Sequence, residues 1–201
     1  MSTTTREKQT EELRIFAERF MHFMNLWTIY RDMLTGHYTP TLGEMYRGEE
    51  AGKEFDTKKW PVNISMMLVL YAYFYSLVED SEEGLNGFRV WREVWPNEGP
   101  AISAVEARVA PFRDRLRVYR NRLGFHGSRT RAHEAKAFEL FSAHSGDEIL
   151  ESMKLFKALG AALLGMDMAV RANNQQEQAR CRKWIDDVAT KAEGMAHSRA
   201  I

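Results

Sequence analysis

The sequence predicts an all-α protein: a single-domain helical bundle of about five to seven helices over residues 1–201. Apolar residues recur at alternating intervals of three and four along most of the chain, which is the period of an amphipathic helix. No segment shows the alternation of apolar and polar residues between turn signals that indicates a strand. A length of 201 residues, 44% hydrophobic and 28% charged, fits one soluble domain with a sizeable core.

Two helices are expected in the first half of the chain. The first covers about residues 6–35 and ends at Gly36 and Pro40. Its apolar stripe comprises Leu13, Phe16, Phe20, Phe23, Trp27, Tyr30 and Leu34. The second covers about residues 62–79 and is apolar on nearly every face, as a central bundle helix should be. The irregular segment of about 36–60 between them is long enough to suggest a functional loop, and a lid and a dimer arm are both open.

The second half is expected to be helical as well. Pro111 should kink or split one of these helices. The last helix is the weakest and could lie at the periphery. Ala161, Gly165 and Ala169 recur every four residues, which is compatible with tight packing inside the bundle or with a homodimer seam. The expected helices cover about 88–95, 101–123, 130–143, 149–170 and 174–197.

Several function classes find no support in the sequence. Cys181 is the only cysteine, so no intrachain disulfide and no cysteine-rich metal site can form. The N-terminus is polar and lacks the apolar core of a signal peptide. The most apolar run, residues 64–78, is shorter than the about 20 residues of a membrane-spanning helix. We therefore expect a cytoplasmic protein that does not associate with membranes.

Metal and nucleophile motifs are missing too. Di-iron bundles need a glutamate three residues before a histidine on two helices, and none of the six histidines has one. The chain also lacks a His-Glu-x-x-His zinc pair, a Gly-x-Ser-x-Gly turn and a phosphate-binding glycine loop. We expect no metal and no other cofactor.

A net charge of zero hides one basic region. Residues 103–136 contain nine basic and three acidic side chains, a net charge of +6, and the rest of the chain carries −6. A solvated helix face is the ordinary explanation of such a cluster. Nearly all of these cations are arginines, however, and the planar fork of arginine suits phosphate better than the point charge of lysine does. The composition of the region therefore favours an anionic partner.

The segment 119–128 is the best candidate for chemistry, because it places Arg120, Asn121 and His126 within seven residues. An arginine can neutralise a phosphate that gains charge, and a histidine can move a proton near neutral pH without a metal. On an ideal α-helix Arg120 and His126 lie about 240° apart. They converge only if the helix unwinds, for which Gly124 offers a place, or if they meet across an interface.

Arg120-Asn121 followed by His126 resembles the signature of the HEPN superfamily, an arginine separated from a histidine by four to six residues. The resemblance implies an all-α homodimer in which two copies of the motif form one metal-independent RNase site, as in many toxin–antitoxin, phage-defence and CRISPR proteins. It also implies Arg120 and His126 as catalytic residues and Asn121 as the supporting polar residue. The subfamily and any antitoxin partner stay open.

The same spacing occurs a second time, in Arg31-Asp32 followed by His37. The basic surroundings favour the Arg120 copy. There, Arg122 could meet His126 across one helical turn without distortion. The side chains expected to bind the RNA backbone are Arg117, Arg122, Ser128, Arg129 and Arg131.

The predicted function is cleavage of single-stranded or loop RNA by attack of the 2′-hydroxyl, which leaves 2′,3′-cyclic phosphate and 5′-hydroxyl ends. The alternative is a non-catalytic, HEPN-like binding or regulatory dimer that docks RNA or a partner protein. A third option is a bundle that binds a small ligand in an aromatic pocket of the second helix.

Overall fold

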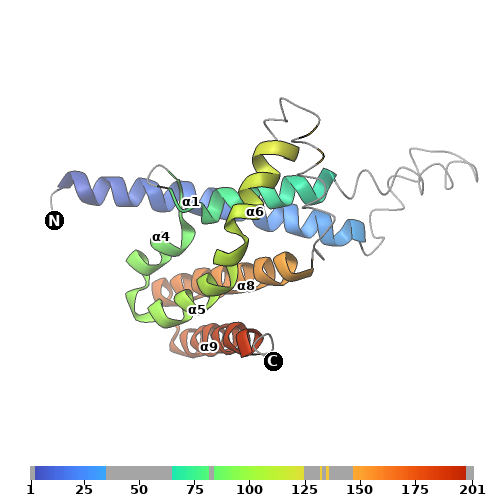
Figure 1. Ribbon diagram of the computed structural model, residues 1–201. Coiled ribbons are helices and arrows are strands. Elements are labelled where there is room, and N and C mark those ends of the chain that lie inside the picture. Colours follow the sequence, from blue (N-terminus) through green and yellow to red (C-terminus); the bar gives the residue numbers. More distant parts are fainter. Residues whose placement is uncertain are drawn as a thin grey trace, which may run out of the picture.

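The computed structural model describes residues 3–34, 65–81, 84–124, 132, 135 and 147–197. These residues form an all-α helical bundle, as predicted (Figure 1). Its helices are α1 (Thr3–Leu34), a helix over residues 65–78, α4 (Gly87–Val94), α5 (Gly99–Val109), α6 (Arg113–Val118), α8 (Asp147–Arg171) and α9 (Gln175–His197). Shorter helical turns are η1 (Pro96–Glu98), η2 (Ala110–Phe112) and η3 (Tyr119–Gly124).

Pro111 splits the helix predicted over 101–123, as expected. Helix α5 ends at Val109, the 3-10 turn η2 holds Pro111 in its first turn, and α6 begins at Arg113. Proline has no N–H to donate within a helix and its ring clashes with the preceding turn, so the chain changes direction there. Figure 1 shows α6 rising away from α5 towards the level of α1.

The core is rich in aromatic rings. Phe156 of α8 lies at its centre, with ring centroids at 4.7–5.9 Å from five other rings. These neighbours come from α1, helix 65–78 and α4, and they are Phe20, Phe23, Phe74, Phe88 and Trp91. The predicted stripe of α1 is buried from Phe16 to Tyr30, whereas Leu13 is 36% exposed.

Helix α9 packs against α5 and α8 and buries Cys181, Ile185, Val188 and Ala192 (Figure 1). A Cβ added to Gly165 of α8 would lie 3.1 Å from the sulfur of Cys181. This small residue therefore lets α9 of the same chain approach closely. Of the two explanations for the repeat of Ala161, Gly165 and Ala169, this contact supports tight packing inside the bundle. A turn separates α8 from α9 at Asn173, whose φ of 51° suits asparagine better than most residues.

Some predicted elements fall outside the described residues. These are the irregular segment of about 36–60 and most of the predicted helix over 130–143, of which residues 132 and 135 are helical. None of the helices that the structure describes has the length and apolar character needed to cross a bilayer.

Candidate functional site: the arginines of α6 and η3

The predicted site residues divide into two groups. Arg117 lies on α6, and Arg120, Asn121 and Arg122 lie on η3; the side chains of the first three are described. His126, Ser128, Arg129 and Arg131 lie outside the described residues, as does His37, the histidine of the second copy of the spacing that begins at Arg31.

The turn that carries Arg120 is a π-helix rather than the predicted α-helix. A π-helix forms i→i+5 hydrogen bonds, and single π turns are frequent at functional sites. Tyr119, at its start, is buried and stacks on Tyr71 with ring centroids 5.9 Å apart and planes 22° apart. The 3.6 residues per turn assumed in the predicted angle of about 240° therefore do not hold over Tyr119–Gly124.

Arg120 contacts Tyr75 of helix 65–78 and Glu79, the residue that follows this helix. Its Nη1 donates to Oε2 of Glu79 at 3.3 Å, and its Cζ lies 5.5 Å from the ring centroid of Tyr75. The arginine side chain is 33% exposed, so it lies at the edge of the core and not in it. Burial raises the pKa of the Tyr75 hydroxyl, and the negative charge of Glu79 raises it further. This hydroxyl is therefore protonated at neutral pH.

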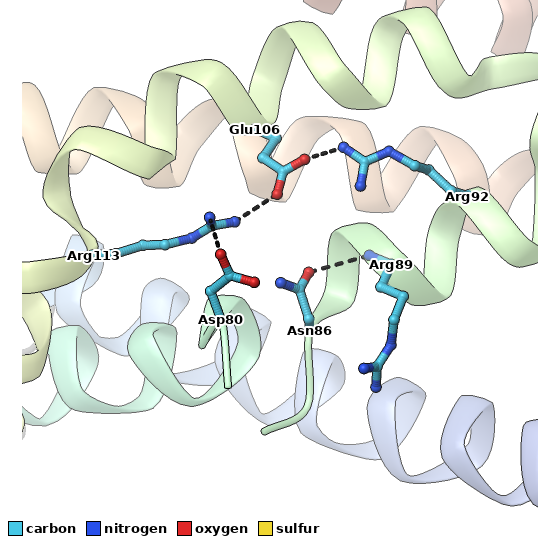
Figure 2. A network of polar contacts seen from close by, with 6 residues as sticks. All are labelled: Asp80, Asn86, Arg89, Arg92, Glu106 and Arg113. Atoms are coloured by element: carbon cyan, nitrogen blue, oxygen red, sulfur yellow. Dashed lines mark hydrogen bonds and ion pairs between the residues drawn. The ribbon is translucent and has the colours of Figure 1, made fainter. Parts of the chain in front are cut away.

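A second polar cluster lies at the start of α6. Figure 2 shows the Glu106 carboxylate of α5 between Arg92 of α4 and Arg113 of α6. Nη2 of Arg113 donates to Glu106 at 2.6 Å, and its Nη1 donates to Asp80 at 3.3 Å. Burial opposes the charged form of Glu106, but hydrogen bonds from Arg92 and Arg113 outweigh it, so the pKa of Glu106 is lowered.

The described arginines of the basic region are therefore largely paired within the chain. Arg113 and Arg120 meet Asp80 and Glu79, which lie next to each other after helix 65–78, and Arg117 pairs with Asp114 at 2.9 Å. The sequence does not reveal Glu79 and Asp80 as partners of these arginines, because Arg120 lies 41 residues after Glu79 and Arg113 lies 33 residues after Asp80. The available signal is two consecutive carboxylates directly after the most apolar helix.

The described part of the chain offers little for other kinds of site. It contains no group of three or more histidine, cysteine, aspartate or glutamate side chains that could hold a metal ion. An apolar groove of about 260 Å³ lies between α1, α4 and α8, and residues such as Met21, Trp91 and Leu164 line it. Helix 65–78 contributes nothing to this groove, so it is not the aromatic pocket considered from the sequence.

The fold and site define an all-α bundle with an arginine-bearing π turn. Protein-family models, curated proteins and solved structures give no match to this chain. The resemblance to the HEPN superfamily therefore stays a prediction from the motif.

Proposed function

We propose that the protein is a metal-independent, HEPN-like endoribonuclease of the toxin or phage-defence type, with Arg120, Asn121 and His126 as its catalytic residues. The observation that carries the proposal is the fixed, partly exposed guanidinium of Arg120 on a π turn. A prepositioned cation can stabilise charge that develops on a phosphate without reorganising during the reaction.

The reaction needs no external nucleophile. The 2′-oxygen of RNA bonds to phosphorus and gives its proton to a base, and the bond from phosphorus to the 5′-oxygen breaks as that oxygen gains a proton. His126 moves these protons, and in a homodimer two copies of His126 divide the base and acid roles. Arg120, with Arg122, neutralises the phosphate oxygens, and Asn121 donates to them.

The substrate and setting follow from the same site. Arg117, Arg122, Ser128, Arg129 and Arg131 bind the backbone of single-stranded or loop RNA without reading its sequence, so affinity falls steeply with salt. We place the protein in the cytoplasm as a homodimer, controlled by an antitoxin or another regulatory protein.

The test is cleavage of total RNA by the purified protein in the presence of a chelator. We expect wild type to leave 2′,3′-cyclic phosphate ends, and Arg120→Ala and His126→Ala to lose roughly 100-fold or more of the activity. Arg180→Ala is the matched control, because Arg180 on α9 is an exposed arginine that pairs with Glu177. Equal activity of wild type and His126→Ala, or loss of activity with the chelator, refutes the proposal.

One observation favours the non-catalytic alternative. Arg120 already has a carboxylate partner in Glu79, as an arginine that only joins two helices would. In that case Arg120→Ala lowers the melting temperature, and wild type and His126→Ala are equally harmless when expressed alone. Toxicity of wild type that His126→Ala relieves supports the enzyme.

A further inference from the structure

We propose that Glu79 is a positioning residue: together with the Tyr75 ring it orients the Arg120 guanidinium for a phosphate of single-stranded RNA. This inference rests on the proposed function and adds the residue that prepares Arg120 for its ligand. The observations behind it are the contacts of Arg120 with Glu79 and Tyr75.

Tyr75 lies in the last turn of helix 65–78 and Glu79 follows its last residue, four positions after Tyr75, so both reach the same side of the helix. The guanidinium carbon lies over the Tyr75 ring at 5.5 Å from its centroid, and Nη1 donates to the Glu79 carboxylate. Tyr75 is only 6% exposed, so its ring is a fixed support. A guanidinium that contacts a ring on one side and a carboxylate through one nitrogen has a restricted orientation.

The contact with Glu79 leaves the arginine able to take a further ligand. A guanidinium has five N–H donors, and the hydrogen bond seen to Glu79 uses Nη1 alone. Its length of 3.3 Å exceeds the about 2.7–2.9 Å of a close charge-assisted pair. Glu79 therefore orients the group without engaging both prongs of the fork, as a bidentate carboxylate would.

Orientation matters because a free arginine side chain loses many rotamers when it binds a phosphate. In this site the loss has already occurred in the unliganded protein, which favours binding and places the charge before the reaction begins. The negative charge of Glu79 acts in the opposite direction, since it repels a phosphate. The two effects have opposite signs, so an experiment can separate them.

Asp80 supplies the matched control. It carries the same charge one residue further along, but it pairs with Arg113 and not with Arg120. General repulsion of phosphate is common to both carboxylates, whereas orientation of Arg120 belongs to Glu79 alone. Glu79→Ala removes charge and acceptor, Glu79→Gln keeps an acceptor, and Asp80→Asn reports the effect of charge.

The experiment measures binding of a fluorescent single-stranded RNA with 2′-O-methyl riboses, which cannot be cleaved, by anisotropy at several salt concentrations. We expect Glu79→Ala to weaken binding roughly tenfold, because the orientation is lost. We expect it to reduce the salt dependence by about one phosphate contact. Glu79→Gln should lie between wild type and Glu79→Ala, and Asp80→Asn should bind at least as well as wild type. In an Arg120→Ala background, Glu79→Ala should add nothing.

Melting temperatures of all variants separate this role from a merely structural one, because Asp80→Asn also breaks an ion pair of the same helix end. Tighter binding by Glu79→Ala, an equal loss in Asp80→Asn, or no binding of the oligonucleotide by wild type overturns the inference. Binding that depends on Glu79 without cleavage of unmodified RNA supports the inference and refutes the catalytic proposal. Cleavage that depends on His126 but not on Glu79 supports the catalytic proposal and refutes the inference about Glu79.

Discussion

At the scale of single residues, Gly160 marks a place where α8 approaches α1 and α4 closely. A Cβ added at this position would lie 2.6 Å from Cε2 of Phe20 and 2.9 Å from Cζ2 of Trp91. Real Cβ atoms do not approach other atoms so closely, and both rings are buried among further rings. A hydrogen is therefore the only side chain that this contact admits without movement.

Gly160→Ala should destabilise the protein by about 1–3 kcal/mol, since overpacking of a filled core exceeds the gain in helix propensity. Gly194→Ala on α9 is the control, because a Cβ there meets no atom within 4 Å. This second substitution should raise stability by up to about 1 kcal/mol. Urea unfolding of both variants checks the prediction, and equal stability of the two would contradict it.

The arginines show where residue-level reading of the sequence fails. Counting charges along residues 103–136 correctly locates the basic region, but it cannot show that Arg113 and Arg120 meet Asp80 and Glu79. Such ion pairs depend on the angle at which two helices cross. That angle is set by packing between residues that are distant in the sequence. The arginine–histidine motif suffers the same limit, because a spacing alone does not place two side chains in space.

At the scale of elements, the start of α4 depends on one capping residue. The side chain of Asn86 accepts a hydrogen bond from the backbone N–H of Arg89 at 3.1 Å (Figure 2). Asn86→Ala leaves that N–H without its partner and should cost about 1 kcal/mol, whereas Asn86→Asp keeps a cap. Thermal unfolding of the two variants measures the difference. Asn86→Ala as stable as Asn86→Asp would show that the cap contributes nothing.

The Glu106 cluster joins α4, α5 and α6, and it should make stability depend on pH. The pKa of Glu106 is lowered in the folded state. The ionised Glu106 therefore stabilises the folded state, and this contribution to the free energy of unfolding is fully present above the usual glutamate pKa of about 4.3. This contribution is lost as the pH falls through the lower, folded value.

Glu106→Gln should therefore be less stable than wild type at pH 7, and the difference should shrink as the solution is acidified below about pH 4. Unfolding free energies from denaturant titrations at pH 7 and in this acidic range test it. Glu177→Gln is the control, because Glu177 forms an exposed pair with Arg180 on α9 and should show little change at either pH. A difference between Glu106→Gln and wild type that does not vary with pH would contradict the linkage.

Most element boundaries could be predicted, because apolar spacing and Gly and Pro positions are local signals. The expected helix of 149–170 is observed as α8 over Asp147–Arg171, and the Pro111 break appears as η2. The π turn of η3 could not be predicted, because a helical pattern in the sequence is matched to the 3.6 residues per turn of an α-helix. Leu13 belongs to the apolar stripe of α1 but is 36% exposed, because periodicity does not show where the partner helices end.

At the scale of the whole molecule, the aromatic cluster around Phe156 joins elements that are distant in the sequence. Phe156 is fully buried, and the rings around it come from α1, helix 65–78 and α4. Nonlocal contacts of this kind make unfolding cooperative, because no element keeps its buried face when the others leave.

Phe156→Ala should consequently lower the unfolding free energy by about 3–5 kcal/mol, the loss of a large buried ring together with the cavity that it leaves. Trp184→Ala is the control, because Trp184 of α9 is 44% exposed and its removal should change stability by no more than about 0.5 kcal/mol. Denaturant unfolding followed by circular dichroism measures both. If Phe156→Ala and Trp184→Ala were equally stable, the cluster would not be the element that unites the bundle. Two separate transitions in wild type would likewise show that the helices unfold in independent groups.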